Sequence, residues 1–277
     1  MVETEIKAER IGVFDSGVGG LTVLRALQAE LPHESFLYLG DTARLPYGTK
    51  SPETVIRYAK QASEILIHRG VKLLVVACNT ATTLALDALH KAFPGIPIIG
   101  VLEPGARAAS SISKNGNIAV IATESTIKSK GYQRAILAIR PEAKVSTQSC
   151  SLFVALAEEG WLDGEITEAI ADRYLKSLFE VEDTLKPDCL VLGCTHFPAL
   201  AASIQKVLGD RVSIVDSAKT TAETVRAVLE AQNLRSENLG NGDAQFLVTD
   251  APDRFARVAQ HFLGAKLNES DIELVDF

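Results

Sequence analysis

Two stretches of the sequence place a cysteine where an apolar run stops. Cys78 follows the run LLVVA (73–77), and Cys194 follows the run CLVLG (189–193). Residues that can donate a hydrogen bond or carry charge come directly after the thiols: Asn79, Thr80, Thr195 and His196. A thiol that opens a helix lies at the positive end of the helix dipole, which can lower its pKa from about 8.5 towards neutrality. The matched positions predict a pair of proton-transfer thiols, although either cysteine alone would also suit a buried core position.

Other uses of these thiols fit the spacing less well. A redox pair normally needs a Cys-x-x-Cys spacing, which neither thiol has. A zinc site from Cys189, Cys194 and His196 is disfavoured, because Cys189 opens a strand that Cys194 ends, about 17 Å farther on at ~3.3 Å per residue. Cys150 and Cys189 precede no polar turn of this kind and are predicted to be inert core thiols. No metal site is therefore expected.

A third strand end carries a carboxyl group. The run GVFDSGVGG (12–20) ends a strand on Asp15 and Ser16 and enters a helix through glycines. The turn lacks the Lys-Ser/Thr pair of a P-loop and the full G-x-G-x-x-G spacing, and the carboxylate of Asp15 would repel a phosphate. Asp15 and Ser16 suit an amino group or a hydroxyl group better.

Composition excludes several classes of protein. The chain has 277 residues, 47% of them apolar and 23% charged, as in an ordinary globular protein. The 28 basic and 35 acidic residues give a net charge of −7, and no basic cluster with interleaved aromatics points to nucleic acid. The first ten residues, MVETEIKAER, include five charged residues and no apolar core of a signal peptide, and no apolar run approaches the ~18 residues that a membrane span needs. The expected location is the cytoplasm, with no membrane contact.

Apolar strands alternate with helical patterns along the chain, which indicates an α/β protein with parallel sheets. Ser51 and Pro52 suit the N-cap and first position of a helix that Gly70 ends. Further helices are expected from about Ser125 to Arg140, through a long region from Leu152 to Leu185, and after Pro198. The segment EPG (103–105) is expected to separate two halves.

The two halves resemble each other. Cys78 and Cys194 are 116 residues apart, and Asp15 and Thr123, each at the end of an early strand, are 108 residues apart. The near agreement indicates an internal pseudo-repeat of about 110 residues. We predict two similar domains: a discontinuous first domain of residues 1–100 plus 216–277, and a second of residues 101–215.

Four separated motifs, GVFDSGVGG, GDTARLPYG, ACNTAT and GCTHFP, resemble those of the cofactor-independent glutamate racemases, and the resemblance covers nearly the whole chain. The resemblance implies two pseudo-symmetric α/β domains with the active site in the cleft between them. It also implies glutamate as substrate, no cofactor, a homodimer, and a supply of D-glutamate for peptidoglycan synthesis. No pyridoxal or metal motif is evident in the sequence, in agreement with a route that needs no cofactor.

The resemblance also assigns roles to single residues. Cys78 and Cys194 would be the acid/base thiols, with Cys78 acting on D-glutamate and Cys194 on L-glutamate. Asp15 and His196 would assist the thiols, and Asp15 with Ser16 would hold the ammonium group. The remaining residues would bind the carboxylates: Tyr47, Gly48, Asn79, Thr80, Thr195 and Thr123.

Glu158 resembles a glutamate that the family places near the site. Ser151 and Ala155 stand close by, where prolines are common in the family, so the chain departs from the pattern there.

Two alternatives remain open at the level of sequence. One is a racemase for aspartate or a related acidic amino acid, although GCTH at the second thiol resembles the glutamate enzymes. The other is a binding protein for acidic amino acids that performs no chemistry. A binding protein has no need of two matched thiols, whereas inversion of a stereocentre needs a base on one face and an acid on the other.

Overall fold

The computed structural model describes residues 10–237 and 239–276. All strand pairs in both of its β-sheets are parallel, which confirms the predicted fold class. The six-stranded sheet has, in spatial order, β10 (Ile272–Leu274), β9 (Ala244–Val248), β2 (Ser35–Gly40), β1 (Arg10–Asp15), β3 (Val71–Val76) and β4 (Ile98–Gly100). The four-stranded sheet has β6 (Lys144–Ser149), β5 (Asn117–Ala122), β7 (Cys189–Gly193) and β8 (Ser213–Asp216).

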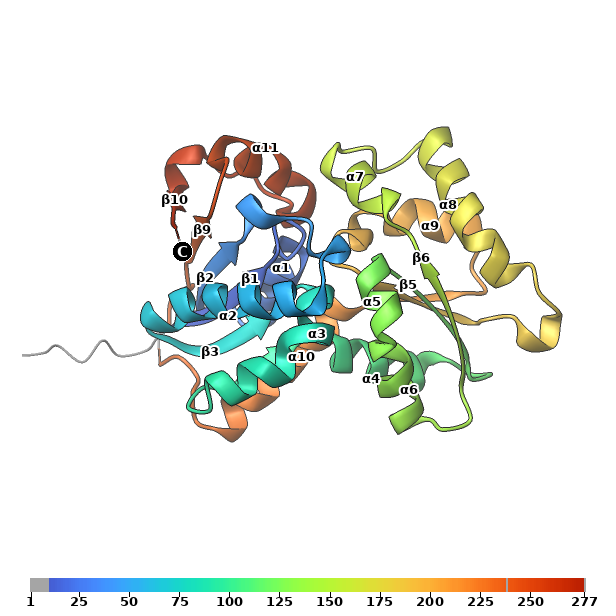
Figure 1. Cartoon of the computed structure of the whole chain (residues 1–277), viewed down its shortest axis with the longest axis horizontal. Helices are drawn as coiled ribbons and strands as arrows, with labels where there is room; N and C mark the ends of the chain where they lie inside the picture. Colours follow the sequence, from blue (N-terminus) through green and yellow to red (C-terminus); the bar gives the residue numbers. More distant parts are fainter. Residues whose placement is uncertain (1–9, 238, 277) are drawn as a thin grey trace, which may run out of the picture.

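The six-stranded sheet is covered by helices on both faces (Figure 1). Successive side chains of a strand point to opposite faces, so Phe14 of β1 packs with one group of helices and Val13 with the other. The Phe14 face is covered by α2 (Pro52–His68) and α3 (Asn79–Ala92). On the Val13 face, α1 (Leu21–Glu30) packs against α10 (Ser217–Ala231) and α11 (Pro252–Leu263).

The four-stranded sheet is built in the same way. Val120 of β5 faces α4 (Leu102–Ile112) and α6 (Gly131–Ile139), whereas Ile121 faces the other side. That other side is covered by α7 (Leu152–Glu158), α8 (Glu165–Phe179) and α9 (Ala201–Leu208). A short helix, α5 (Glu124–Ser129), follows β5 and contacts α3, which covers the six-stranded sheet.

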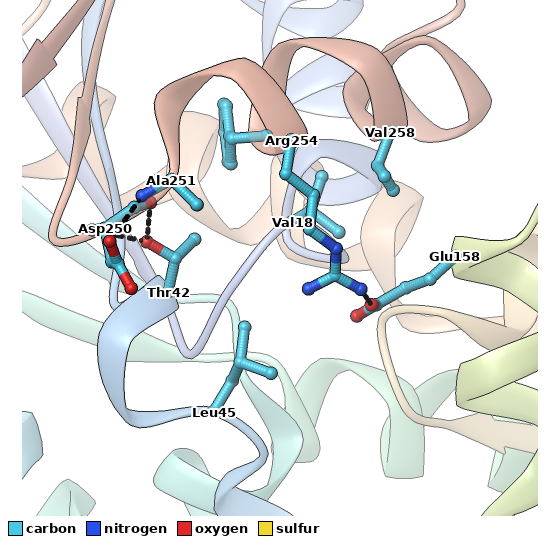
Figure 2. A pocket seen from close by; sticks show the side chains of 9 residues that line it. Val18, Thr42, Leu45, Glu158, Asp250, Ala251, Arg254 and Val258 are labelled. Carbon is cyan, nitrogen blue, oxygen red and sulfur yellow. Dashed lines mark hydrogen bonds and ion pairs between the residues drawn. The ribbon is translucent and has the colours of Figure 1, made fainter.

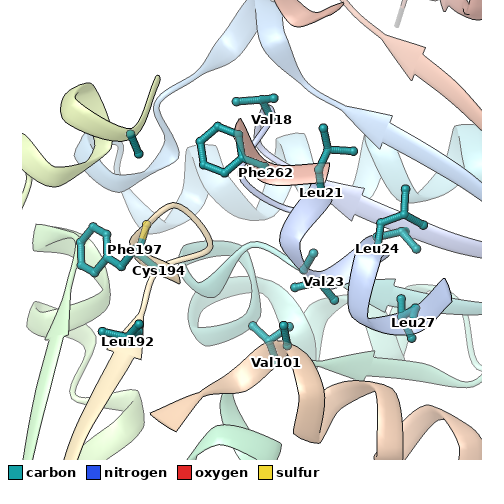
Figure 3. Close-up of a cluster of buried hydrophobic side chains, with 14 of the residues drawn as sticks. Val18, Leu21, Val23, Leu24, Leu27, Val101, Leu192, Cys194, Phe197 and Phe262 are labelled. Atoms are coloured by element: carbon teal, nitrogen blue, oxygen red, sulfur yellow. The ribbon is translucent and has the colours of Figure 1, made fainter. Parts of the chain in front are cut away.

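One hydrophobic core joins the two sheets (Figure 3). Val18 in the turn after β1 and Leu21, the first residue of α1, belong to the same buried cluster as Phe262 of α11 and Phe197 beyond β7. Cys194 also belongs to this cluster. The loops at the ends of β1 and β7 are therefore held against each other by apolar packing, which fixes the relative position of the groups that they carry.

The expected helix of residues 125–140 is wrong, because the structure has α5 and α6 there with Lys130 between them at φ +56°. The long helical region of residues 152–185 is also interrupted. Gly160 at φ +73° and Gly164 at φ +91° separate α7 from α8, and a 3-10 turn covers Asp183–Leu185. A left-handed backbone cannot continue a right-handed helix, so Lys130 ends α5 and Gly160 prevents α7 from continuing. Gly164 is the N-cap from which α8 begins.

The EPG segment lies between the two sheets, as expected, since β4 ends at Gly100 and β5 begins at Asn117. Its residues form part of the first turn of α4, where Pro104 needs no intrahelical N–H partner. One further helix expectation is corrected. Pro198 lies in a 3-10 turn, Phe197–Leu200, and the α-helix α9 starts only at Ala201.

The helix signals around α2 are confirmed. Ser51 is its N-cap and accepts a hydrogen bond from the Thr54 N–H at 3.3 Å, and Pro52 is its first residue. Gly70 follows the helix at φ +78°. The strands of the six-stranded sheet come from residues 10–100 and 244–274, and those of the four-stranded sheet from residues 117–216. The domain bounds 1–100 plus 216–277 and 101–215 stay a prediction about folding units.

Candidate active site

The candidate residues stand at or just beyond the carboxyl ends of β1, β3, β5 and β7. Asp15 is the last residue of β1, and Thr123 and Cys194 directly follow β5 and β7. Cys78 comes two residues after β3. In parallel α/β sheets the turns that follow the strands form the ligand sites.

Cys78 is the N-cap of α3, as expected for a thiol that opens a helix. Its sulfur accepts a hydrogen bond from the Ala81 N–H at 3.5 Å, and the residue is only 6% exposed. The expectation of a lowered pKa is nevertheless wrong. Burial and the nearby Asp15 carboxylate raise the pKa of Cys78 to about 12, although Ser16 and the Ala81 N–H stabilise its thiolate. Loss of hydration outweighs the helix dipole, so Cys78 is a thiol at neutral pH.

Asp15 lies beside this thiol and is completely buried. Its Oδ2 accepts a hydrogen bond from the Gly17 N–H at 2.9 Å. Burial raises the pKa of the Asp15 carboxyl, and the positive charge of His196 opposes that rise. Asp15 therefore links the surroundings of one thiol electrostatically to those of the other.

Cys194 ends a chain of polar contacts on the opposite side. Its sulfur is 3.9 Å from His196 Nδ1, and His196 Nε2 is 3.1 Å from Glu158 Oε1. Glu158 Oε2 in turn accepts a hydrogen bond from Arg254 Nη2 at 2.8 Å. The thiol, the imidazole, the carboxylate and the guanidinium form one relay that we call the Cys194 relay.

The electrostatics of the Cys194 relay favour a protonated His196 and an ionised Glu158. Burial alone would lower the pKa of His196, but hydrogen bonds and Coulomb interactions with Cys194 and Glu158 outweigh it and raise the pKa to about 10. Burial alone would raise the pKa of Glu158, but His196 and Arg254 hold it below its usual value. His196 is therefore an imidazolium at neutral pH, with one N–H directed to each neighbour.

Hydrogen-bonding groups from segments that follow strands of both sheets meet near Cys78. Thr80 Oγ1 of α3 lies 3.0 Å from Thr123 Oγ1, and Ser125 donates a hydrogen bond to the Gly48 carbonyl at 2.7 Å. Asn79 Oδ1 accepts a hydrogen bond from the Tyr132 hydroxyl at 2.6 Å, whereas its buried Nδ2 has no partner among the described residues. An unpaired buried donor is costly, so the Asn79 amide is well suited to a ligand carboxylate.

Two glycines allow the loops of the two sheets to approach closely. A Cβ at Gly19 would lie 2.4 Å from His196 Nδ1 and 2.6 Å from Thr195 Oγ1. A Cβ at Gly48 would lie 2.7 Å from the Cβ of Thr123. Thr195 also contacts α1, because its carbonyl accepts a hydrogen bond from the Thr22 hydroxyl at 3.1 Å. Gly48 and Thr195 thus lie where these loops meet.

The hydroxyl of Tyr47, which was expected to bind a substrate carboxylate, has a partner within the protein. Its hydroxyl is buried and donates to Asp41 Oδ2, so this proton does not point to a ligand carboxylate. The aromatic ring packs with Phe14 and Tyr58, which supports the loop that carries Gly48.

Sequence reasoning missed two contributors. Tyr132 orients Asn79 from α6, and Arg254 contacts Glu158 from α11. Neither residue follows a strand, and no motif marks either of them.

The described residues contain no group of three or more His, Cys, Asp or Glu side chains arranged to hold a metal ion. In the same part of the chain no helix is both long and apolar enough to cross a membrane.

Comparison with known proteins agrees with this geometry. The family model described as Asp/Glu/Hydantoin racemase matches residues 20–225. The chain is 49% identical to the glutamate racemase of Geobacter metallireducens over 259 residues, which is 94% of each chain.

Solved structures are similar over almost their whole length. The glutamate racemase of Francisella tularensis in complex with D-glutamate has a TM-score of 0.88 at 36% identity, covering 97% of this chain and 98% of that one. Glutamate racemase RacE1 of Bacillus anthracis has a TM-score of 0.90 at 38% identity, covering 98% of both. The resemblance seen in the four sequence motifs is confirmed, and the chain belongs to the Asp/Glu/hydantoin racemase family.

Proposed function

We propose that this chain is a glutamate racemase that interconverts L- and D-glutamate by proton transfer between two thiols. The observation that carries the proposal is the pair of buried thiols, Cys78 and Cys194, at the ends of strands from two different sheets. Each thiol has its own polar partners, and the Cys194 charge is among the causes that raise the pKa of Cys78. The similarity to named glutamate racemases supports glutamate as the substrate.

The two thiols have different surroundings, which suits opposite roles in one turnover. For L-glutamate, Cys194 beside the His196 imidazolium would take the α-proton as a thiolate, leaving the C–H electron pair on the α-carbon. The Cys78 thiol would then give its proton to the opposite face. In the reverse direction Cys78 is the base and Cys194 the acid, as microscopic reversibility requires.

The α-proton of an amino acid is very weakly acidic, so the negative charge that develops must be stabilised by donors already in place. The Asn79 amide, the Thr80 and Thr195 hydroxyls and backbone N–H groups would bind the carboxylates. Asp15 and Ser16 would hold the ammonium group. No cofactor is needed in this scheme, because the donors and the exclusion of water lower the barrier.

The proposal is tested by incubating purified protein with L-glutamate in D₂O, with no added cofactor. We expect the circular dichroism signal to decay to zero as deuterium enters the α-position. L-aspartate serves as the competing substrate, and faster loss of its signal would identify an aspartate racemase. A binding protein would change neither the signal nor the isotope content.

The two-thiol mechanism has its own test, in the single variants Cys78→Ser and Cys194→Ser. Both should lose racemisation, because a serine hydroxyl is too weak an acid to replace a thiol. Each should still remove the α-proton from one enantiomer of a glutamate analogue with a leaving group on the β-carbon. The C–H electron pair then forms the Cα=Cβ bond as the leaving group departs, and the enamine hydrolyses to a 2-oxo acid and ammonia. Processing of the same enantiomer by both variants would contradict two bases on opposite faces.

We further propose that the protein works as a homodimer in the bacterial cytoplasm and supplies D-glutamate for peptidoglycan. The family resemblance supports these statements. Light scattering of the purified protein tests the dimer. Deletion of the gene should create a D-glutamate requirement, and growth without D-glutamate or another source of it would count against that role.

A further inference from the structure

Arg254 reaches Glu158 across a pocket between α11 and α7 (Figure 2). Its Nη2 donates to Glu158 Oε2 at 2.8 Å, while the other carboxylate oxygen, Oε1, faces His196 Nε2 at 3.1 Å. The Glu158 side chain is 13% exposed and that of Arg254 is 45% exposed. Both oxygens of one carboxylate are therefore held by cations from different segments of the chain.

The local structure disfavours both charges where they stand. Glu158 is the last residue of α7, where the partial negative charge of the free carbonyl groups repels a carboxylate. Arg254 lies in the first turn of α11, where the free N–H groups repel a guanidinium. Neither helix gains from its own charged residue, so the pair is explained by the tertiary contact and not by helix propensity.

The contact also crosses between the two sheets. Arg254 comes from the segment that adds β9 and β10 to the six-stranded sheet, whereas Glu158, His196 and Cys194 come from the segment of the four-stranded sheet. Without Arg254, Oε2 would be free and the carboxylate could rotate away from the imidazole. The ring of His196 would then lose the partner that fixes its orientation towards Cys194.

We propose that Arg254 is a positioning residue for proton transfer at Cys194: by holding Glu158, it fixes His196 beside that thiol, whereas no hydrogen bond between described residues joins Cys78 to the relay. This inference rests on the two-thiol function proposed above. It predicts that loss of Arg254 slows one half of the reaction only, which a purely structural role would not do.

The test uses Arg254→Gln in two backgrounds that each retain one thiol. In Cys78→Ser, Cys194 is the sole base, and we expect Arg254→Gln to slow elimination from the β-substituted analogue by roughly tenfold or more, because misplacement of a catalytic group costs rates of this size. In Cys194→Ser, Cys78 is the sole base. There Arg254→Gln should leave the elimination rate within about twofold of the rate with Arg254 present, because Cys78 is not a member of the relay. Arg254→Lys, which keeps the charge but not the planar fork, should restore part of the rate in the first background.

Arg257 provides the matched control. It lies on the same helix one turn later, is exposed, and its side chain has no hydrogen bond or ion pair to another described residue. Arg257→Gln should leave elimination unchanged in both backgrounds. Urea unfolding of all variants compares their stability.

The outcomes separate this inference from the function that it rests on. If wild-type protein racemises glutamate, but Arg254→Gln slows elimination equally in both backgrounds or in neither, the positioning role of Arg254 is overturned and the function stands. If wild-type protein does not racemise, or neither single-thiol background eliminates, the two-thiol function is overturned and Arg254 loses its role with it. Loss confined to the Cys78→Ser background supports the proposal.

Discussion

The positive charge of His196 depends on Glu158, which contacts it although it is 38 residues away in the chain. We predict that Glu158→Gln lowers the pKa of His196 from about 10 by about one unit or more, because an anion next to an imidazolium favours the charged form. A pH titration that follows the NMR signals of the His196 ring protons measures the change in this pKa. Glu159→Gln, on the exposed neighbouring residue, should leave the pKa of His196 unchanged, and an equal shift in both variants would contradict the direct contact.

The same pKa has a consequence for stability. His196 has a folded-state pKa of about 10, above its unfolded value of about 6.5, so its protonation stabilises the fold fully below pH 6.5. This contribution is lost as the pH rises through 10. Wild-type protein should therefore lose more stability than Glu158→Gln between pH 7 and pH 10 in urea unfolding. A steeper loss in the variant would contradict the sign.

Cys78 offers a second prediction at the residue scale. Since its pKa is about 12, only a small fraction is thiolate at neutral pH, and this fraction rises about tenfold per pH unit below the pKa. In the Cys194→Ser variant without substrate, alkylation of Cys78 by iodoacetamide should therefore keep rising about tenfold per unit from pH 7 to pH 10. Peptide mass mapping follows the reaction, with completely buried Cys189 as the internal control. A rate that levels off near pH 8.5 would indicate an ordinary thiol.

At the scale of elements, the junction between α5 and α6 depends on one residue in an unfavourable conformation. Lys130 is exposed at φ +56°, which costs a residue with a Cβ about 1 kcal/mol. Lys130→Gly should remove that strain and, after the greater entropy lost by glycine on folding, raise the free energy of unfolding by about 0.5 kcal/mol.

The opposite sign is expected two residues earlier. Lys128 lies within α5 and pairs with Glu124, so Lys128→Gly should cost about 1 kcal/mol. Urea denaturation of both variants measures the difference. If glycine destabilised the protein equally at both positions, the left-handed conformation of Lys130 would not be the reason that the helix ends there.

At the scale of the whole molecule, the site depends on the close approach of loops from two sheets. Gly19→Ala should push the loop after β1 away from Thr195 and His196, because a Cβ there would lie 2.4 Å from His196 Nδ1. We expect a loss of racemisation of roughly a hundredfold, since displacement of a reacting group by about 1 Å costs this much. Gly95→Ala, whose Cβ would meet nothing within 4 Å, should retain wild-type activity. Near wild-type activity of Gly19→Ala would show that the two loops need not touch.

The sequence by itself determined the elements and the positions that carry the chemistry. The apolar runs before Cys78 and Cys194, the strand end at Asp15 and the cap at Ser51 are local patterns, and each element formed where its pattern lies. Local signals were insufficient at Lys130 and in the EPG segment. The residue type lysine does not indicate the left-handed backbone that Lys130 adopts. A proline is accepted in the first turn of a helix as readily as in a loop, so Pro104 did not indicate that the segment is helical.

Only the tertiary structure decided the charge states and the partners. Cys78 stands at a helix N-terminus, which by itself would lower its pKa, but burial among residues from other strands and the charge of Asp15 reverse the direction. Arg254 reaches Glu158 over 96 residues of chain, and Glu158 reaches His196 over 38. Dielectric surroundings and charge pairing depend on distance in space, which no local pattern records, so these properties of the site arise only when the two sheets pack together.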